Sequence, residues 1–229
     1  MAIPNASLTL RALARLLSYP DARLREGLQE LRGAIYSERA LPLARIAEID
    51  VLVGQLAAQD PLESEARYVE CFDRGRATSL HLFEHVHGDS RDRGPAMVDL
   101  AKTYASTGLF LGDGELPDYL PVVLEFASTR PAPEARAFLG ETTHILNAIF
   151  TALRERGSPY ASLLGAVIEL AGEKAQAVPL PPEPTLDESW TEPEAFGGCS
   201  TGGQARPSDP QPVRIVRPAS ANASRGAAR

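Results

Sequence analysis

The sequence predicts an all-α protein, built as a single helical bundle of eight or nine helices with a disordered, Pro-rich C-terminal tail. Three observations lead to this prediction. Apolar residues recur at helical spacing through most of residues 7–177. No alternating β-branched run is long enough to form a strand. After residue 177 the composition changes, because nine of the 19 prolines fall there among Gly, Ser and Ala.

The first four helices are marked by apolar spacing and by the residues at their starts. Ser7 is expected to be the N-cap of the first helix, and the next three begin after Asp21, at Pro42 and at Pro61. Their expected inward positions are Leu10, Leu13, Leu17, Leu24, Leu28, Leu31, Ile46, Ile49, Val53, Leu56, Leu62, Val69 and Phe72.

Shorter helices are expected over residues 79–86, which Gly88 ends, and around 97–104. The stretch GDGELPDYLP then predicts a turn followed by a helix start. Gly112 and Gly114 allow positive φ in that turn, and Pro117 suits the first helical turn. Two longer helices should follow, over residues 134–156 and 158–177.

The helical domain is therefore expected to span residues 1–177 and the tail residues 178–229. The tail is too poor in apolar residues to offset the entropy of ordering it, which predicts disorder. One segment differs: DESWTEPEAFGG, residues 187–198, carries Trp190 and Phe196 among acidic residues. We interpret it as a short docking segment.

Charge and composition exclude several classes of function. The net charge is -7, and no Lys/Arg-rich stripe is present, so we expect no nucleic-acid binding. An acidic surface instead favours a basic partner. The two cysteines, Cys71 and Cys199, are far apart and indicate a reducing compartment. The first twenty residues lack the pattern of a signal peptide, and no apolar window reaches the ~18 residues of a membrane span. We therefore expect a cytoplasmic protein without stable membrane insertion.

One pentapeptide raises the question of a metal site. Residues 81–85, His-Leu-Phe-Glu-His, match the H-x-x-E-H signature of inverted zinc proteases. In that alternative, His81 and His85 bind zinc, Glu84 is the general base, and Glu155 or Glu169 supplies a third ligand. The pattern is short and the chain lacks a predicted sheet. We therefore favour the interpretation that the histidines are ordinary residues of a short helix, with no metal and no bound cofactor.

Two neighbouring stretches also carry polar side chains of interest. In GDSRDRG, Arg91 and Arg93 precede a helix and could bind an anion, but Asp89 and Asp92 favour ion pairs within the loop. In ELPDYLPVVLEF, Asp118 is expected to cap a helix or to lie in its first turn. Glu115 and Glu125 should lie at the same end of the bundle as an apolar surface formed by Leu120, Leu124 and Phe126.

Three segments carry a resemblance to a known family: YVECFDR (68–74), SLHLFEHVHGDSRDRGPAM (79–97) and ELPDYLPVVLEF (115–126). They resemble the NarJ-type assembly chaperones of respiratory nitrate reductase, also called the nitrate reductase delta subunit family. The helical pattern resembles that family over about residues 8–177, and residues 187–198 resemble its acidic, Trp-containing end.

The resemblance implies a chaperone and not an enzyme. Such chaperones bind the catalytic (alpha) subunit of respiratory nitrate reductase before it is complete, and they recognise its N-terminal segment. They hold it for insertion of the bis-molybdopterin guanine dinucleotide cofactor and delay its docking on the membrane anchor. The implied processes are unfolded protein binding, nitrate assimilation and anaerobic respiration, with cofactor-delivery proteins as further partners. A chaperone for a different molybdoenzyme, and a stable subunit of a larger complex, remain as alternatives.

The resemblance also implies a binding site for the client peptide. In its first motif, His85, Gly88, Asp89, Arg91 and Arg93 are expected to shape a groove. In its second motif, the matching residues are Glu115, Pro117, Asp118, Tyr119, Pro121 and Glu125. We expect Asp118 and Glu125 to face basic residues of the partner, and Tyr119, Leu120 and Leu124 to line its apolar strip.

Overall fold

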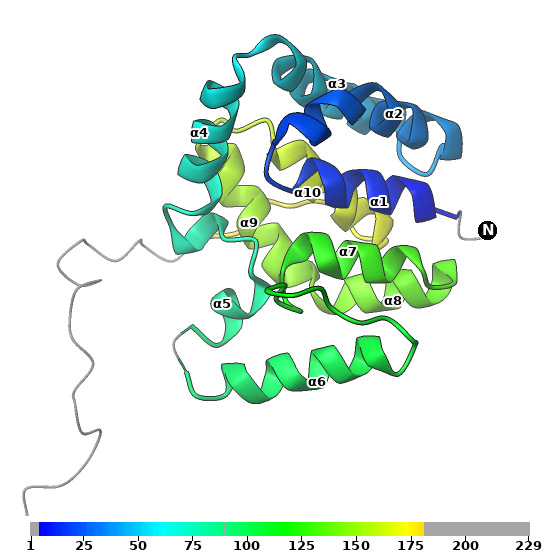
Figure 1. Cartoon of the computed structure of the whole chain (residues 1–229), viewed down its shortest axis with the longest axis vertical. Helices are drawn as coiled ribbons and strands as arrows, with labels where there is room; N and C mark the ends of the chain where they lie inside the picture. The colour runs from blue at the N-terminus through cyan, green and yellow to red at the C-terminus, as the bar shows by residue number, and fades with distance from the viewer. Residues whose placement is uncertain (1–4, 89, 181–229) are drawn as a thin grey trace, which may run out of the picture. The chain divides into compact units, whose positions relative to one another are not determined.

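Helix α1 (Ser7–Leu16) is the element around which much of the bundle is arranged. In the computed structural model, which describes residues 5–88 and 90–180, α1 packs against α2 (Ala22–Glu38), α7 (Leu120–Ser128) and α10 (Ala161–Leu170). Figure 1 shows α2 and α3 on one side of α1, with α7 and α8 on the other.

The described residues contain ten α-helices, one 3-10 helix and no β-strand. The remaining elements are α3 (Leu43–Ala58), α4 (Pro61–Phe72), η1 (Arg76–Thr78), α5 (Leu82–Val86), α6 (Arg93–Ala105), α8 (Ala132–Glu141) and α9 (Thr143–Glu155). The all-α prediction is thus confirmed, with one more helix than the upper number predicted.

The extra helix arises because the helix predicted over residues 134–156 is two helices, α8 and α9. The chain breaks at Thr142, whose hydroxyl donates to the carbonyl of Leu139 (2.9 Å). The hydroxyl of Thr143 donates to the carbonyl of Gly140 (2.6 Å). Threonine side chains that bond to nearby carbonyls compete with the helical backbone, so apolar spacing alone did not reveal this break.

Two other predicted boundaries also differ. The last helix, predicted over residues 158–177, is the shorter α10, and Gly172 follows it with φ +90°. Helix α7 begins at Leu120, so the prediction that Pro117 opens it was wrong; Pro121 holds the first-turn position instead. Of the two glycines expected at positive φ in that turn, Gly114 has φ +82°, whereas Gly112 is not among the positive-φ residues.

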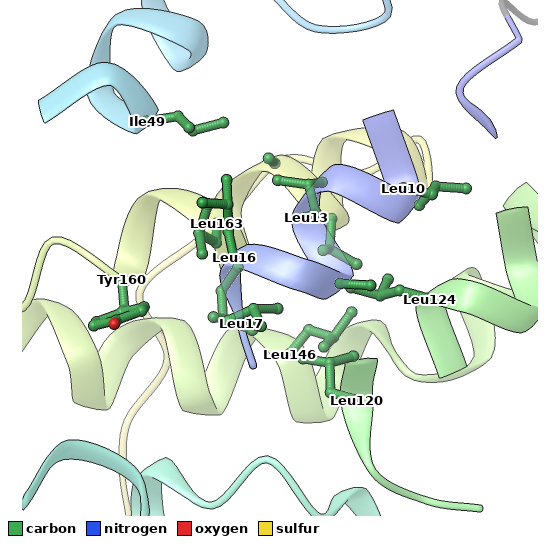
Figure 2. Packing of buried hydrophobic residues seen from close by; sticks show 14 of the residues in the cluster. Leu10, Leu13, Leu16, Leu17, Ile49, Leu120, Leu124, Leu146, Tyr160 and Leu163 are labelled. Carbon is green, nitrogen blue, oxygen red and sulfur yellow. The ribbon is translucent and has the colours of Figure 1, made fainter. Parts of the chain in front are cut away.

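The buried core is centred on the leucines of α1. Leu13, Leu16 and Leu17 are fully buried. Figure 2 shows them between Ile49 and Leu163 on one side and Leu120, Leu124 and Leu146 on the other. A helix buried on most of its circumference must be apolar around most of it, which explains the run LTLRALARLL.

The N-terminus of α1 is stabilised by a side chain from another helix. The carboxylate of Glu38, at the end of α2, accepts hydrogen bonds from the backbone N–H groups of Leu8 (3.0 Å) and Thr9 (2.7 Å). Ser7 is the first helical residue, and its hydroxyl donates to the carbonyl of Ser128 (2.5 Å). The prediction that Ser7 is the N-cap was therefore wrong, because a long-range carboxylate satisfies the free amides.

The predicted docking segment with Trp190 and Phe196, and nearly all of the predicted tail, lie outside the described residues. Within the described residues, none of the helices is long and apolar enough to cross a membrane.

We predict that Leu13→Ala lowers the free energy of unfolding by about 2–5 kcal/mol, because it leaves a cavity where α1 meets its neighbours. Urea denaturation followed by circular dichroism measures the change. Leu62 was expected to face inward but is 74% exposed, so Leu62→Ala is the matched control and should change stability by less than about 0.5 kcal/mol. Equal effects of the two substitutions would contradict this description of the core.

Candidate functional site

A single backbone bridge joins the two motifs that the sequence singled out. His81 and Tyr119 form an antiparallel β-bridge just before α5 and α7. The N–H of Leu82 donates to the carbonyl of Asp118 (3.0 Å), and the N–H of Leu120 donates to the carbonyl of Leu80 (2.8 Å). Residues nearly forty positions apart are thereby held side by side at the starts of two helices.

Asp118 lies beneath this bridge and is fully buried. Its Oδ2 accepts a hydrogen bond from the N–H of Phe83 (3.1 Å), in the first turn of α5, and lies 3.8 Å from Nη2 of Arg93. Arg93 also pairs with Glu84 at 3.3 Å. Because no part of Asp118 is exposed, the expectation that it faces a basic partner was wrong. Its carboxylate instead anchors α5 and the start of α6.

The two histidines of the H-x-x-E-H pattern lie in different local environments. His81 precedes α5 in extended backbone, with Nδ1 3.5 Å from Oδ1 of Asp118. His85 is inside α5, and its Nε2–H donates to the carbonyl of Ser79 (2.9 Å). Glu169, one of the expected third ligands, pairs with Arg45 at 2.9 Å. Across residues 5–88 and 90–180, no three His, Cys, Asp or Glu side chains are grouped to hold a metal ion.

The environments shift the pKa values of these histidines in opposite directions. The side chain of Asp118 raises the pKa of His81, and this effect outweighs the lowering by burial. Burial lowers the pKa of His85, outweighing its contact with Ser79. At neutral pH, His85 is therefore a neutral structural group, whereas His81 gains proton affinity from the buried carboxylate.

Tyr119 lies at the open edge of the bridge. Its ring stacks on His81 with a centroid separation of 5.2 Å, and its hydroxyl is 3.1 Å from that of Tyr68. Tyr68 in turn donates to the carbonyl of Leu17 (2.7 Å), at the end of α1. Tyr119 is only partly buried, and it lines a cleft beside the bridge.

Leu120 and Leu124 do not form an accessible strip. Both are fully buried and point into the core, as Figure 2 shows, so the expectation that they line a partner's binding strip was wrong. Exposed apolar side chains lie instead in the segment before the bridge, where Phe110 is 82% exposed and Leu116 is 43% exposed. Helical periodicity identifies an apolar position, but it does not say whether a neighbouring helix covers it.

Two clefts open beside the bridge. The first, of about 440 Å³, is lined by Ser18, Tyr19, Tyr68, Phe72, Asp73, Leu80, His81, Gly114, Glu115, Leu116, Tyr119, Pro121, Val122 and Glu125. The second, of about 390 Å³, is lined by Arg11, Tyr104, Leu109, Phe110, Leu111, Glu115, Val122, Glu125, Phe126, Ser128 and Thr129. They share Glu115, Val122 and Glu125, so the two clefts adjoin as one groove.

The shared wall of the groove carries negative charge. Glu115 and Glu125 are both exposed, and Glu115 accepts a hydrogen bond from the N–H of Gly112 (2.8 Å). Partial burial raises the pKa of Glu125, and the charge of Glu115 raises it further, while Arg11 and Arg15 oppose the shift. Two carboxylates that repel one another are stabilised when a cation arrives between them.

The described residues of the first motif that were expected to shape a groove do not line it, whereas Leu80 and His81 of the same segment line the first cleft. Gly88 ends α5 with φ +52°, as predicted, and Arg93 is held by Glu84 and Asp118. Neither His85 nor Arg91 lines either of the two clefts. Asp89 lies outside the described residues. Sequence reasoning did not assign Tyr19, Asp73 or Phe110 to a site; Asp73 lies in the YVECFDR segment, whereas no motif marked Tyr19 or Phe110.

The described residues thus form a helical fold with an open groove that has apolar lining and acidic side chains at its shared wall. The nitrate reductase delta subunit family matches residues 20–164, and the chain belongs to that family. It is 46% identical over 159 residues to the nitrate reductase molybdenum cofactor assembly chaperone NarJ of Escherichia coli K12, covering 69% of this chain and 67% of NarJ.

A second relative and one solved structure agree with this assignment. The probable nitrate reductase molybdenum cofactor assembly chaperone NarW of the same strain is 40% identical over 163 residues, covering 71% of this chain and 68% of NarW. A redox enzyme maturation protein structure from Archaeoglobus fulgidus superposes with a TM-score of 0.51 at 19% identity. The superposition covers 73% of this chain and 94% of the Archaeoglobus chain, and at this identity it supports the fold alone. As a member of a family of assembly chaperones, the chain is not itself an enzyme.

We predict that Asp118→Ala lowers the free energy of unfolding by about 1.5–3 kcal/mol, because the Phe83 amide and Arg93 lose their buried acceptor. Asp118→Asn retains an acceptor and should cost less. Urea denaturation measures both, with Asp113→Ala in the exposed loop as the control. A near-neutral Asp118→Ala would show that the carboxylate does not anchor α5.

The two histidines should give stability a pH dependence of opposite sign. The pKa of His81 is raised in the folded state, so protonated His81 stabilises the fold below about pH 6.5. This contribution is lost as the pH rises through the pKa that His81 has in the folded protein. A lowered pKa means that His85 opposes folding as pH falls below about 6.5.

Unfolding midpoints in urea at pH 5.5, 6.5 and 8 test this with two variants. Relative to the wild type, His81→Gln should lose more stability at pH 5.5 than at pH 8. His85→Gln should show the reverse, being least harmful at pH 5.5. Parallel pH profiles for both variants would contradict the opposite shifts, since all other titrating groups are common to them.

Proposed function

We propose that the chain is a dedicated chaperone for the catalytic subunit of a nitrate reductase. It binds the N-terminal segment of that subunit before the enzyme is complete, assists insertion of the molybdenum cofactor and delays docking on the membrane. Family membership supports the client class, because the relatives are nitrate reductase assembly chaperones.

The groove formed by the two adjoining clefts is the observation that supports peptide binding. Apolar and aromatic surface lies along it, from Tyr19 and Tyr119 in the first cleft to Phe110 in the second. An amphipathic helix that places its apolar face on this surface would bury the exposed side chains of Phe110 and Leu116. Such burial would supply most of the affinity.

The charges along the groove favour a basic segment. The first cleft contains the carboxylates of Asp73, Glu115 and Glu125 and no Lys or Arg. The second adds Arg11, whose Nε–H donates to the hydroxyl of Ser128 (3.2 Å) and is thus partly engaged. A peptide with Lys or Arg along one edge would therefore be attracted to the shared wall, and salt would weaken that attraction.

Calorimetric titration tests the proposal with a peptide copying roughly the first 15 residues of the cognate catalytic subunit, about four helical turns. We expect one-to-one binding to the wild type that weakens between low and high salt. The double variant Glu115→Gln/Glu125→Gln should bind about tenfold more weakly at low salt, with little salt dependence remaining. Phe110→Ala should weaken binding at both salt concentrations equally.

The matched control is Glu26→Gln/Glu30→Gln, which removes two exposed carboxylates from α2, away from the groove. It changes the net charge by the same amount, so it isolates local attraction from the total charge. Equal weakening by both double variants would remove Glu115 and Glu125 from the site. Absence of binding to the wild-type chain would refute the proposed recognition of the N-terminal segment.

A further inference from the structure

A further cleft, of about 660 Å³, lies on the flank of α4 that faces away from the groove. It is bounded by the end of α3, by α4 and by the connection between α9 and α10. Its lining residues are Leu52, Gln55, Leu56, Gln59, Ser64, Arg67, Glu70, Cys71, Arg74, Arg156, Ser158, Pro159 and Tyr160. A volume of this size suits a small organic ligand.

The lining of this cleft is cationic, in contrast to the groove. Arg67, Arg74 and Arg156 contribute three guanidinium groups, against the single carboxylate of Glu70. Nη1 of Arg156 donates a hydrogen bond to the hydroxyl of Thr78 (3.1 Å), which helps to position the guanidinium group. Arg67 pairs with Glu63, but both side chains are more than half exposed, and such a bridge is readily exchanged for a stronger anion.

A buried hydroxyl at the same cleft has no partner within the described residues. Tyr160 is only 6% exposed, its ring packs against Phe72 at a centroid distance of 5.0 Å, and its hydroxyl lacks a hydrogen bond among these residues. Burial raises the pKa of this phenol, so it remains a proton donor at neutral pH. A buried donor left unsatisfied carries a free-energy cost that a ligand acceptor would remove.

We propose that this cleft binds a phosphate-bearing ligand of nucleotide size. Guanidinium groups match the geometry of phosphate oxygens, and several around one cleft suit a diphosphate better than a single carboxylate. Tyr160, with its unpartnered hydroxyl, and Ser158, whose hydroxyl contacts Sγ of Cys71 (3.6 Å), also line the cleft. The amide side chains of Gln55 and Gln59 offer hydrogen bonds to the remainder of the ligand.

This site is separate from the proposed peptide groove. Arg67, Glu70 and Arg74 line one flank of α4 and its end, whereas Tyr68, Phe72 and Asp73 line the groove on the other. No residue lines both clefts, and the charged residues that line them are mostly acidic in the groove and mostly basic in this cleft. If binding at one of the two sites is refuted, binding at the other can therefore still be tested.

Calorimetric titration of the full chain with guanosine diphosphate, adenosine diphosphate and inorganic pyrophosphate tests the proposal. We expect saturable binding of a nucleoside diphosphate that pyrophosphate displaces and that weakens with salt. Tyr160→Phe and Arg74→Gln should each lower the affinity about tenfold, the usual consequence of losing one hydrogen bond to a charged group. Arg23→Gln, at an exposed arginine of α2, is the matched control and should bind like the wild type.

Tyr160→Phe also separates binding from folding. Removing an unpartnered buried hydroxyl should leave the unfolding midpoint unchanged or raise it, so a weaker affinity in this variant cannot result from misfolding. Absence of binding by all three probes would overturn the proposal. So would binding that guanosine alone reproduces, or binding that Tyr160→Phe and Arg74→Gln leave unchanged, since the phosphate contacts would then play no part.

Discussion

The buried carboxylate of Asp118 is the interaction on which the site depends. It accepts from the amide of Phe83, lies near Arg93 and His81, and sits directly beside the β-bridge that joins the two motifs. A buried charge is stable only with such partners around it. The bridge in turn sets where α5 and α7 begin, and thereby where Tyr119, Glu115 and Glu125 meet the groove. A stretch with little regular structure is thus held in place by one acidic side chain.

Some residues of the second motif line the groove, and others are buried and support it. Alternate residues turn in opposite directions at the bridge, so Asp118 and Leu120 enter the interior while Tyr119 remains at the surface. Leu124 continues the core along α7, and Glu125 emerges one position later. A short segment therefore positions the helix and also lines the groove, which accounts for the close alternation of acidic and apolar residues in ELPDYLPVVLEF.

The sequence allowed the fold class and most helices to be predicted, because apolar spacing reports directly on helix faces. It did not reveal contacts between distant residues. Glu38 caps α1 from the far end of α2, and Asp118 satisfies the first turn of α5, so the groups that stabilise these two helix starts could not be assigned from local signals. Of the predicted site residues, Glu115, Tyr119 and Glu125 line the clefts, whereas Leu120 and Asp118, which were expected to face the partner, are buried. Their burial depends on packing with α1 and α5, which sequence spacing does not specify.

Helix α4 has a consequence for how the two binding surfaces would communicate. One of its flanks borders the acidic groove and the other borders the arginine-lined cleft, so it is a wall common to both. A ligand that shifts this helix changes the shape of both sites at once. By thermodynamic linkage, each ligand would then alter the affinity of the other by the same factor. Such reciprocity would let the release of a bound peptide depend on the occupancy of a site that the peptide never touches.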